Sequence, residues 1–423
     1  MVDKKLVGFK QILKNRNFFL LWLGQIISQF GDRLDQMALI GFISQRFPGS
    51  TFQMAKLLSF TIIPVFLIGP VAGVYVDRWD RRKTMYISDF LRGILVLFIP
   101  LIFLNLRSLF GLYIVIFLVF SVGRFFVPAK LSIIPDLVKK EELLMANSLV
   151  NTTGMIAAVL GFGVGGLIVD WLGPKGGFCV DALTFFVSAV FIFSITTKTM
   201  KTKGDLFTLG REVLEVIKKS VFQEAKEGLT YLLKKRGVRF TIGILFMLWS
   251  ALGSIYIVMI VFIQQRLGSL TKDLGLLVVF LGLGLFLGSL AYGRFGQRFS
   301  PAKSIFFFLS LSGVTLIIFS LGLQFLPNFL VAALLSFLFG FVLSPIITAC
   351  NTLVHKLSHQ DMRGKVFASL EIVMHLGFLL FMFLSSILAE KVGGVWILVG
   401  VGVVFGLVGV SGLFRRPKVS WSE

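Results

Sequence analysis

The feature that most constrains this chain is a series of long apolar runs. A helix needs about 20 predominantly apolar residues to cross a membrane. Twelve such runs occur in the 423 residues, approximately at 18–45, 55–77, 84–106, 109–134, 145–170, 177–197, 238–265, 272–293, 302–324, 328–353, 365–389 and 393–414. Runs of this length must satisfy their backbone hydrogen bonds internally, because lipid offers no partners. Strands of a membrane barrel would be about 10 residues long and would alternate in hydropathy. The sequence therefore predicts an all-α membrane protein with 12 transmembrane helices.

Composition and missing motifs exclude several classes of protein. The chain is 56% hydrophobic and only 15% charged, whereas soluble domains average about 25% charged residues. This balance disfavours a water-soluble enzyme, a disordered regulator and a secreted disulfide scaffold. Cys179 and Cys350 show no paired spacing, so neither a disulfide framework nor a metal site is expected. The phosphate-binding loop of ATPases, the His-Glu-x-x-His motif and the nucleophile elbow are absent from the sequence, so we expect no cofactor and no enzymatic activity.

A polar interval at about 198–237 divides the runs into six and six. Within it, five apolar residues fall at helical spacing while charged residues occupy the other faces. These five are Leu214, Ile217, Val221, Ala225 and Leu232. The pattern is typical of an amphipathic helix on the membrane surface. We therefore predict an N-tail (1–17), an N-terminal six-helix bundle (18–197), this linker (198–237), a C-terminal six-helix bundle (238–416) and a C-tail (417–423).

The basic residues predict the orientation in the membrane. The net charge is +21, with 42 Lys and Arg residues. If the N-terminus is cytoplasmic, the cytoplasmic intervals hold 30 of them, the opposite side holds 7, and 5 lie within or at the edges of the runs. Cytoplasmic loops of membrane proteins carry such an excess of Lys and Arg. Both termini are thus expected in the cytoplasm, and the charge requires no nucleic-acid partner.

The strongest local motif is the stretch 73–83, Gly-Val-Tyr-Val-Asp-Arg-Trp-Asp-Arg-Arg-Lys, which connects the second and third runs. Its glycine permits close approach of helices, and its charges can form ion pairs that latch a cytoplasmic gate. The gate residues predicted here are Gly73, Asp77, Arg78, Arg81 and Arg82. The alternative is a topology-setting basic loop whose charges are solvated.

This motif, read as Gly-x-x-x-Asp-Arg-x-x-Arg-Arg, resembles the signature of the major facilitator superfamily, and the layout of six plus six helices agrees with it. Further stretches resemble the bacterial drug-efflux group that includes macrolide exporters and the enterobactin exporter. They are Lys14–Phe18, Gly31-Asp32, Pro128–Lys130 through Pro135-Asp136, Ala146-Asn147 and Arg363–Phe367. The resemblance implies two bundles that alternate around a central cavity in the cytoplasmic membrane. We expect a monomer whose partners are membrane lipids, protons and a lipophilic or amphipathic small molecule.

Two positions depart from the family pattern. Gly293 stands where a second copy of the loop motif would carry aspartate, and Phe162 stands where drug antiporters often carry proline. The surrounding Gly161, Gly165 and Gly166 still allow close helix packing.

Ionisable residues inside the runs are candidates for coupling. A charge there costs at least about 2.5–3.5 kcal/mol on insertion scales, so it usually faces a cavity or a partner. Asp32 and Asp35 lie three residues apart and share one helix face. We expect them to load and unload protons, with Asp32 as the first choice. The alternatives are structural ion pairs, for example with Arg33 or Arg124, or a position near water.

Three basic residues and one further pair complete the set. Arg92 has Asp89 three residues before it as a local partner, and Arg124 is assigned to a cavity or proton path. Lys130 either snorkels to the interface or lines the path, because its Pro-Ala-Lys context resembles lysophospholipid transporters of the same superfamily. Glu371 and His375, four residues apart, could relay protons. The alternatives are a loop arginine as partner of Glu371 and a packing role for His375.

The resulting hypothesis is a secondary transporter that exports an amphipathic or hydrophobic small molecule, driven by the proton gradient. The alternatives are a lysophospholipid transporter and, from another class, a non-transporting membrane receptor or scaffold.

Overall fold

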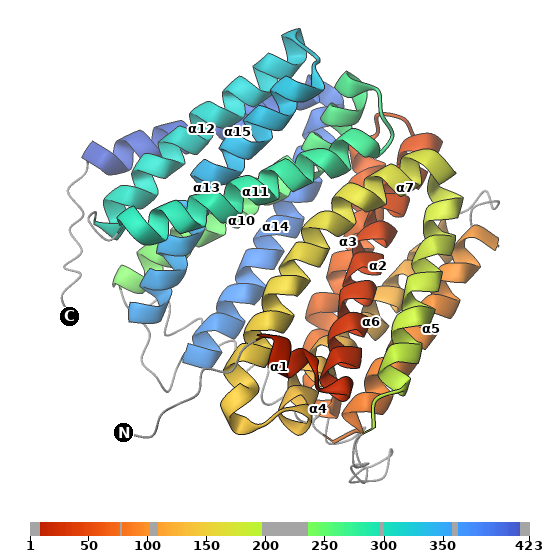
Figure 1. The fold of residues 1–423 in the computed structure, drawn as a ribbon. Coiled ribbons are helices and arrows are strands. Elements are labelled where there is room, and N and C mark those ends of the chain that lie inside the picture. The colour runs from red at the N-terminus through yellow and green to blue at the C-terminus, as the bar shows by residue number, and fades with distance from the viewer. Residues whose placement is uncertain are drawn as a thin grey trace, which may run out of the picture. The chain divides into compact units, whose positions relative to one another are not determined.

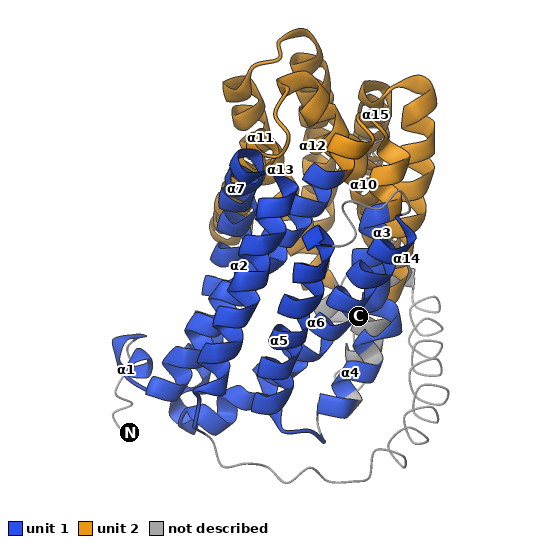
Figure 2. Ribbon diagram, turned by 90° about the vertical axis from the view of Figure 1, so that its right-hand side faces the viewer, with its two compact units in different colours: residues 1–42, 57–217 blue, residues 43–56, 218–423 orange. Residues whose placement is uncertain are grey.

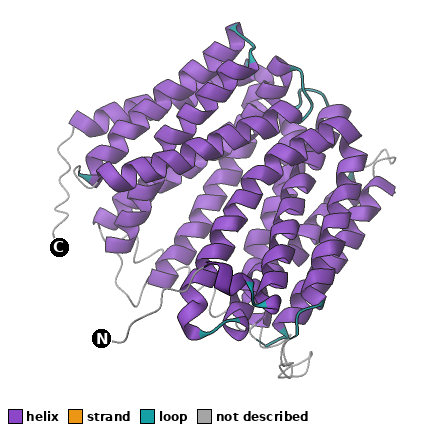
Figure 3. Ribbon diagram, viewed as in Figure 1, coloured by secondary structure: helices purple, strands orange, loops and turns teal. Residues whose placement is uncertain are grey.

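The computed structural model describes residues 9–76, 78–101, 109–196, 236–296, 300–357 and 363–414. Figure 1 shows the helices, and Figure 3 shows that no strand occurs in these ranges. The first-half helices are α1 (Phe9–Leu13), α2 (Arg16–Arg46), α3 (Thr51–Leu67), α4 (Gly69–Val76), α5 (Arg81–Leu101), α6 (Phe110–Leu137), the 3-10 turn η2 (Lys140–Glu142) and α7 (Leu143–Phe193). The second-half helices are α10 (Arg236–Leu267), α11 (Lys272–Phe295), α12 (Pro301–Phe325), α13 (Phe329–Leu357), α14 (Arg363–Val392) and α15 (Gly394–Phe414).

Nine helices in the described part of the chain are long and apolar enough to cross a membrane. Each predicted run falls on a helix, but the correspondence is not one to one. The run 55–77 is divided between α3 and α4, whereas α7 covers both 145–170 and 177–197. Inside α7, Gly173 has φ 72° and ψ 171°, a left-handed conformation that favours glycine, and Pro174 follows it. The chain therefore turns at Gly173 between two helical segments.

The chain forms two compact units, which Figure 2 colours separately. Unit 1 comprises residues 1–42 and 57–217, and unit 2 comprises residues 43–56 and 218–423. The segment 43–56 joins unit 2 because its polar groups bond there. The Thr51 hydroxyl donates to the Ser386 carbonyl at 2.7 Å, and the Ser44 hydroxyl donates to Gln264 Oε1 at 2.8 Å.

Two asparagines fasten the start of α2 within unit 1. Asn15 Oδ1 accepts from the Phe18 amide at 3.3 Å, which caps the helix, while Asn15 Nδ2 donates to the Leu137 carbonyl at 2.6 Å. Asn17 exchanges two hydrogen bonds with the Thr196 backbone, at 2.8 and 3.0 Å. Phe18 is fully buried in an apolar cluster that also contains Leu21, Phe126 and Ile192. These contacts give a physical reason for the stretch 14–18 that resembles the drug-efflux group.

Helices α11 and α13 of unit 2 pack closely where a glycine of one helix faces the backbone of the other. A Cβ built on Gly284 of α11 would overlap the Phe337 carbonyl oxygen, and one built on Gly340 of α13 would overlap the Leu281 carbonyl oxygen. Small residues at a helix interface allow this approach in membrane proteins. Large apolar side chains meanwhile remain exposed, among them Phe110, Trp171 and Leu330. Such exposure suits a lipid environment, since a soluble monomer rarely leaves so many apolar groups uncovered.

Candidate functional site

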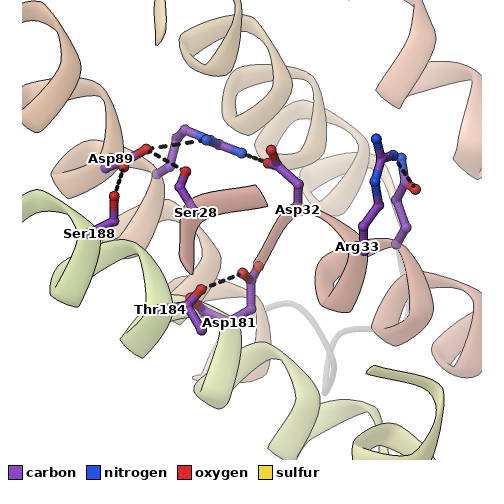
Figure 4. A network of polar contacts seen from close by, with 9 residues as sticks. Ser28, Asp32, Arg33, Asp89, Asp181, Thr184 and Ser188 are labelled. Carbon is purple, nitrogen blue, oxygen red and sulfur yellow. Dashed lines mark hydrogen bonds and ion pairs between the residues drawn. The ribbon is translucent and has the colours of Figure 1, made fainter. Parts of the chain in front are cut away.

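A buried charged cluster lies inside unit 1, where α2, α5, α6 and α7 meet, and Figure 4 shows its centre. Arg92 of α5 is only 4% exposed and forms ion pairs with two carboxylates. One is Asp32 of α2, and the other is Asp89 on its own helix, at 3.3 Å. The guanidinium also lies over the Phe185 ring, 4.0 Å from its centroid. The local Arg92–Asp89 pair considered from the sequence is confirmed, and Asp32 is an additional partner 60 residues away.

Asp89 connects three helices. It is fully buried, and it accepts from the Ser28 hydroxyl at 3.1 Å and from the Ser188 hydroxyl at 2.6 Å. Together with Arg92, these hydroxyls give the Asp89 carboxylate hydrogen-bond donors from α2, α5 and α7. A buried carboxylate needs several donors, because a desolvated charge without them is costly. Asp89 thus has the contacts of a structural anion.

The two aspartates predicted for coupling differ in their surroundings. The Asp32 side chain is 33% exposed and pairs with Arg92, rather than with Arg33 or Arg124 as the sequence alternatives had it. Arg33 instead donates to Gln36 Oε1 at 3.1 Å and lies over the Phe162 ring. Asp35 is 2% exposed, and its Oδ1 is buried without a hydrogen-bond partner among the described residues.

Asp181 is a member of the cluster that the sequence-based predictions do not include. It lies fully buried on the second segment of α7. The Thr184 hydroxyl donates to its Oδ1 at 3.3 Å, while its Oδ2 is buried and has no hydrogen-bond partner in the described part of the chain. A Cβ built on Gly31 would lie 2.6 Å from Asp181 Oδ1, so any larger residue there would displace a neighbouring side chain. The available signal was an acidic residue within the apolar run 177–197.

Lys130 does not snorkel to the interface, so that alternative is wrong. Its side chain is 7% exposed, and Nζ donates to Gln25 Oε1 at 3.2 Å. Gln25 is held in turn by a bond from its Nε2 to the Val150 carbonyl, at 3.2 Å. Arg124, also on α6, lies close enough to Arg92 for their like charges to repel. Arg124 therefore lies beside the cluster, whereas Lys130 lies buried against Gln25 of α2.

The predicted gate residues have different partners. Arg81 forms an ion pair with Asp136 at 2.8 Å, which joins the start of α5 to the end of α6. Arg82 donates to the Ile195 carbonyl at 2.5 Å and lies over the Phe193 ring. Asp77 lies outside the described residues. The Arg78 backbone amide donates to the Tyr75 carbonyl at 3.0 Å.

The glycines predicted to allow close helix packing differ in whether another helix approaches them. A Cβ on Gly73 would meet no described atom within 4 Å, so the close helix approach expected there is not found in this part of the structure. A Cβ on Gly161 would lie 2.9 Å from Arg33 Cβ, and one on Gly165 would lie 3.2 Å from Leu34 Cα. Gly166 is buried in the same stretch. The backbone of α7 therefore packs directly on α2 beside Asp32.

Unit 2 contains the remaining candidates. The His375 ring lies 5.3 Å from the Trp249 ring, centroid to centroid, which makes it part of the packing between α14 and α10. The Glu371 side chain lies outside the described residues, so a relay between the two stays a prediction. The linker 198–237 is likewise outside the described residues, except for its last two positions at the start of α10. The C-tail 417–423 is outside them altogether.

Comparison with known proteins identifies the family. The Major Facilitator Superfamily model matches residues 21–270 and 242–423. The uncharacterized MFS-type transporter YkuC of Bacillus subtilis is 27% identical over 419 residues, covering 97% of this chain and 94% of its own. The putative bacilysin exporter BacE of the same species is 25% identical over 425 residues, covering 97% and 95%. Macrolide efflux protein A of Streptococcus pyogenes is 23% identical over 388 residues, covering 89% and 90%.

Solved structures show the same fold. A bacterial homologue of the iron transporter ferroportin, in its inward-facing state, superimposes with a TM-score of 0.68 at 16% identity, covering 97% of this chain and all of its own. A POT family transporter in complex with 5-aminolevulinic acid gives 0.71 at 13% identity and covers 98% of each chain. Together with the exposed apolar helices and the charged cluster, these matches lead to one conclusion: the chain belongs to the major facilitator superfamily and is a multi-pass transporter of the cytoplasmic membrane, not an enzyme.

Proposed function

We propose that this protein is a secondary active exporter of a hydrophobic or amphipathic small molecule, driven by the proton gradient. In this proposal 12 helices span the membrane in two six-helix bundles, both termini are cytoplasmic, and the bundles alternate access to a central cavity. Full-length similarity to a putative bacilysin exporter and to a macrolide efflux protein supports export. The sequence contains no ATP-binding loop, which leaves an ion gradient as the energy source.

The observation that carries the proposal is the Asp32–Arg92 ion pair inside the apolar helices. Charges inside apolar membrane-spanning helices are expensive and mark substrate or ion pathways. Asp32 is the partly exposed member of the pair, whereas Arg92 is buried. Asp32 can therefore exchange its cationic partner, for a proton or for a positively charged substrate, without unfolding its surroundings. We assign Asp32 to coupling on this basis.

Everted membrane vesicles provide the test. Ethidium and erythromycin serve as probes, and respiration supplies a gradient with the acid side inside. Wild-type vesicles are expected to accumulate at least one probe, and an uncoupler should abolish the accumulation. Asp32→Asn should lose it, while Asp170→Asn, an exposed aspartate on α7, should retain it. Accumulation that an uncoupler does not change, or full accumulation in Asp32→Asn, would contradict the proposal.

A lysophospholipid is the second candidate substrate, and Lys130 is the observation that favours it. Its ammonium group is buried, and its described contact is with an amide oxygen rather than a carboxylate. A phosphodiester headgroup could supply the missing negative charge. Fluorescent lysophosphatidylethanolamine should then enter spheroplasts that make the wild-type protein and be excluded from those that make Lys130→Met. A receptor or scaffold would instead show counterflow of none of these compounds.

A further inference from the structure

Two carboxyl groups of the cluster lack the partners that an ionised group requires. Asp35 is 2% exposed and Asp181 is fully buried, and each has one oxygen without a hydrogen-bond partner among the described residues. Neither forms an ion pair in the described part of the chain. Ionised carboxylates buried without a counterion cost several kcal/mol, and proteins avoid this by keeping them neutral. These two groups therefore have the surroundings of protonated acids, in contrast to Asp89.

The ionisable neighbours of Asp181 come from two adjoining helices. Asp35 on α2, together with Asp89 and Arg92 on α5, lies near enough for electrostatic interaction with it. Arg124 on α6 interacts electrostatically with Arg92. A negative charge on Asp35 or Asp89 disfavours a negative charge on Asp181, whereas the positive charge of Arg92 favours it. Arg92 thus interacts with Asp181 while it is ion-paired with Asp32.

We propose that Asp181 carries the transported proton. Its protonation state then controls whether Arg92 stays ion-paired with Asp32. This proposal rests on the proton-driven export proposed above and names the group that holds the proton. While Asp181 is protonated, Arg92 pairs with Asp32 and Asp89, as in the structure. When the carboxyl O–H bond breaks, the proton passes to water and the new carboxylate competes for the guanidinium.

The competition has a consequence for Asp32. Its side chain is 33% exposed, so it can meet another cation when Arg92 turns toward Asp181. A substrate with a protonated amine or another fixed positive charge is the chemical class that a free carboxylate selects. Reprotonation of Asp181 returns Arg92 to Asp32 and displaces the substrate. Proton and substrate therefore exclude each other, which is the requirement for antiport.

Gly31 and Thr184 position the proposed proton carrier. The absence of a side chain at Gly31 lets α2 approach Asp181, and Thr184 supplies a hydrogen bond to Oδ1. Neither residue can itself hold the proton. Thr184→Val therefore offers a mild probe, because it removes one hydrogen bond from Asp181 and leaves the carboxyl in place.

Two measurements on purified protein test the proposal. Infrared difference spectra between acidic and alkaline pH report the C=O stretch of protonated carboxyl groups. Asp181→Asn should lose one component of this band, Thr184→Val should shift that component in frequency, and Asp170→Asn should leave that component in place. In weakly buffered detergent solution, ethidium should release protons from the wild-type protein. Asp181→Asn stays neutral and leaves Arg92 paired with Asp32, so it should bind ethidium more weakly and release no protons.

Opposite results would overturn the proposal. An infrared band that neither Asp181→Asn nor Thr184→Val alters would show that Asp181 is not the protonated group, and the Thr184 variant decides the matter if Asp181→Asn does not fold. Proton release that persists in Asp181→Asn would assign the proton elsewhere. Either failure leaves proton-driven accumulation in wild-type vesicles intact, whereas failure of the proposed function would show as its absence there.

Discussion

At the scale of single residues, Arg92 determines how the acidic cluster is organised. Its guanidinium forms ion pairs with Asp32 on α2 and Asp89 on α5, and it also packs on Phe185 of α7. One cation therefore compensates the negative charges of two carboxylates. Its loss would leave the fully buried Asp89 without a counterion.

We therefore expect Arg92→Met to lower the free energy of unfolding by about 3–5 kcal/mol, because a buried charge loses its partner. Denaturation by SDS in mixed micelles measures the change. Arg92→Met combined with Asp89→Asn should recover part of the loss, since the uncompensated charge is then removed. Lys83→Met, at an exposed position, is the control. Equal stability of Arg92→Met and the control would show that the cluster does not depend on this cation.

At the scale of elements, the N-terminus of α3 is capped from a distant helix. Glu390, near the end of α14, accepts from the Ser50 hydroxyl at 2.7 Å and from the Phe52 amide at 3.0 Å with the same oxygen. The first turn of a helix has free amides and a positive dipole end, so a carboxylate stabilises it. This contact also helps to explain why residues 43–56 belong to unit 2.

Glu390→Ala should reduce stability by about 0.5–1 kcal/mol, the range of an exposed helix cap. Glu390→Gln should cost less, because its amide oxygen still accepts both hydrogen bonds. Thermal melting in detergent compares these variants with Glu141→Ala, which removes an exposed glutamate elsewhere. A larger loss for Glu390→Gln than for Glu390→Ala would contradict the capping role.

Glycine contacts determine how α11 and α13 pack. Gly340 faces the backbone of α11 so closely that any Cβ must displace it. Gly340→Leu should therefore cost about 1–3 kcal/mol or more, as overpacking does, and should lower the melting temperature. Gly400→Ala, where a Cβ would meet no described atom within 4 Å, is the matched control. If both variants melt at the wild-type temperature, the two helices do not pack as described.

At the scale of the whole molecule, orientation follows from the distribution of charge. The excess of Lys and Arg on one set of loops predicts cytoplasmic termini. Green fluorescent protein fused after residue 423 should fluoresce, and alkaline phosphatase fused there should be inactive. The activities should reverse for fusions after Gly268, in the connection between α10 and α11. The same reporter activity at both positions would contradict the predicted topology.

The sequence predicted the helices more fully than it predicted which side chains pair with one another. The helices follow from hydropathy, which each segment carries by itself. In the described residues, α3 and α4 divide one predicted run, whereas the turn at Gly173 separates the runs 145–170 and 177–197 as the sequence placed them. The charges Asp32, Asp35, Arg92 and Lys130 could be recognised because each interrupts an apolar run. Asp181 interrupts a run in the same way, so it could have been found by the same criterion.

By itself, the sequence determined that this chain is helical, resides in a membrane and belongs to a transporter family, because hydropathy, charge asymmetry and local motifs are properties of contiguous residues. Only the tertiary structure decided that Arg92 pairs with Asp32, that Arg81 pairs with Asp136, and that Lys130 faces Gln25. These partners lie 60, 55 and 105 residues apart. Their meeting depends on how each helix is rotated about its axis, and packing against neighbouring helices sets that rotation.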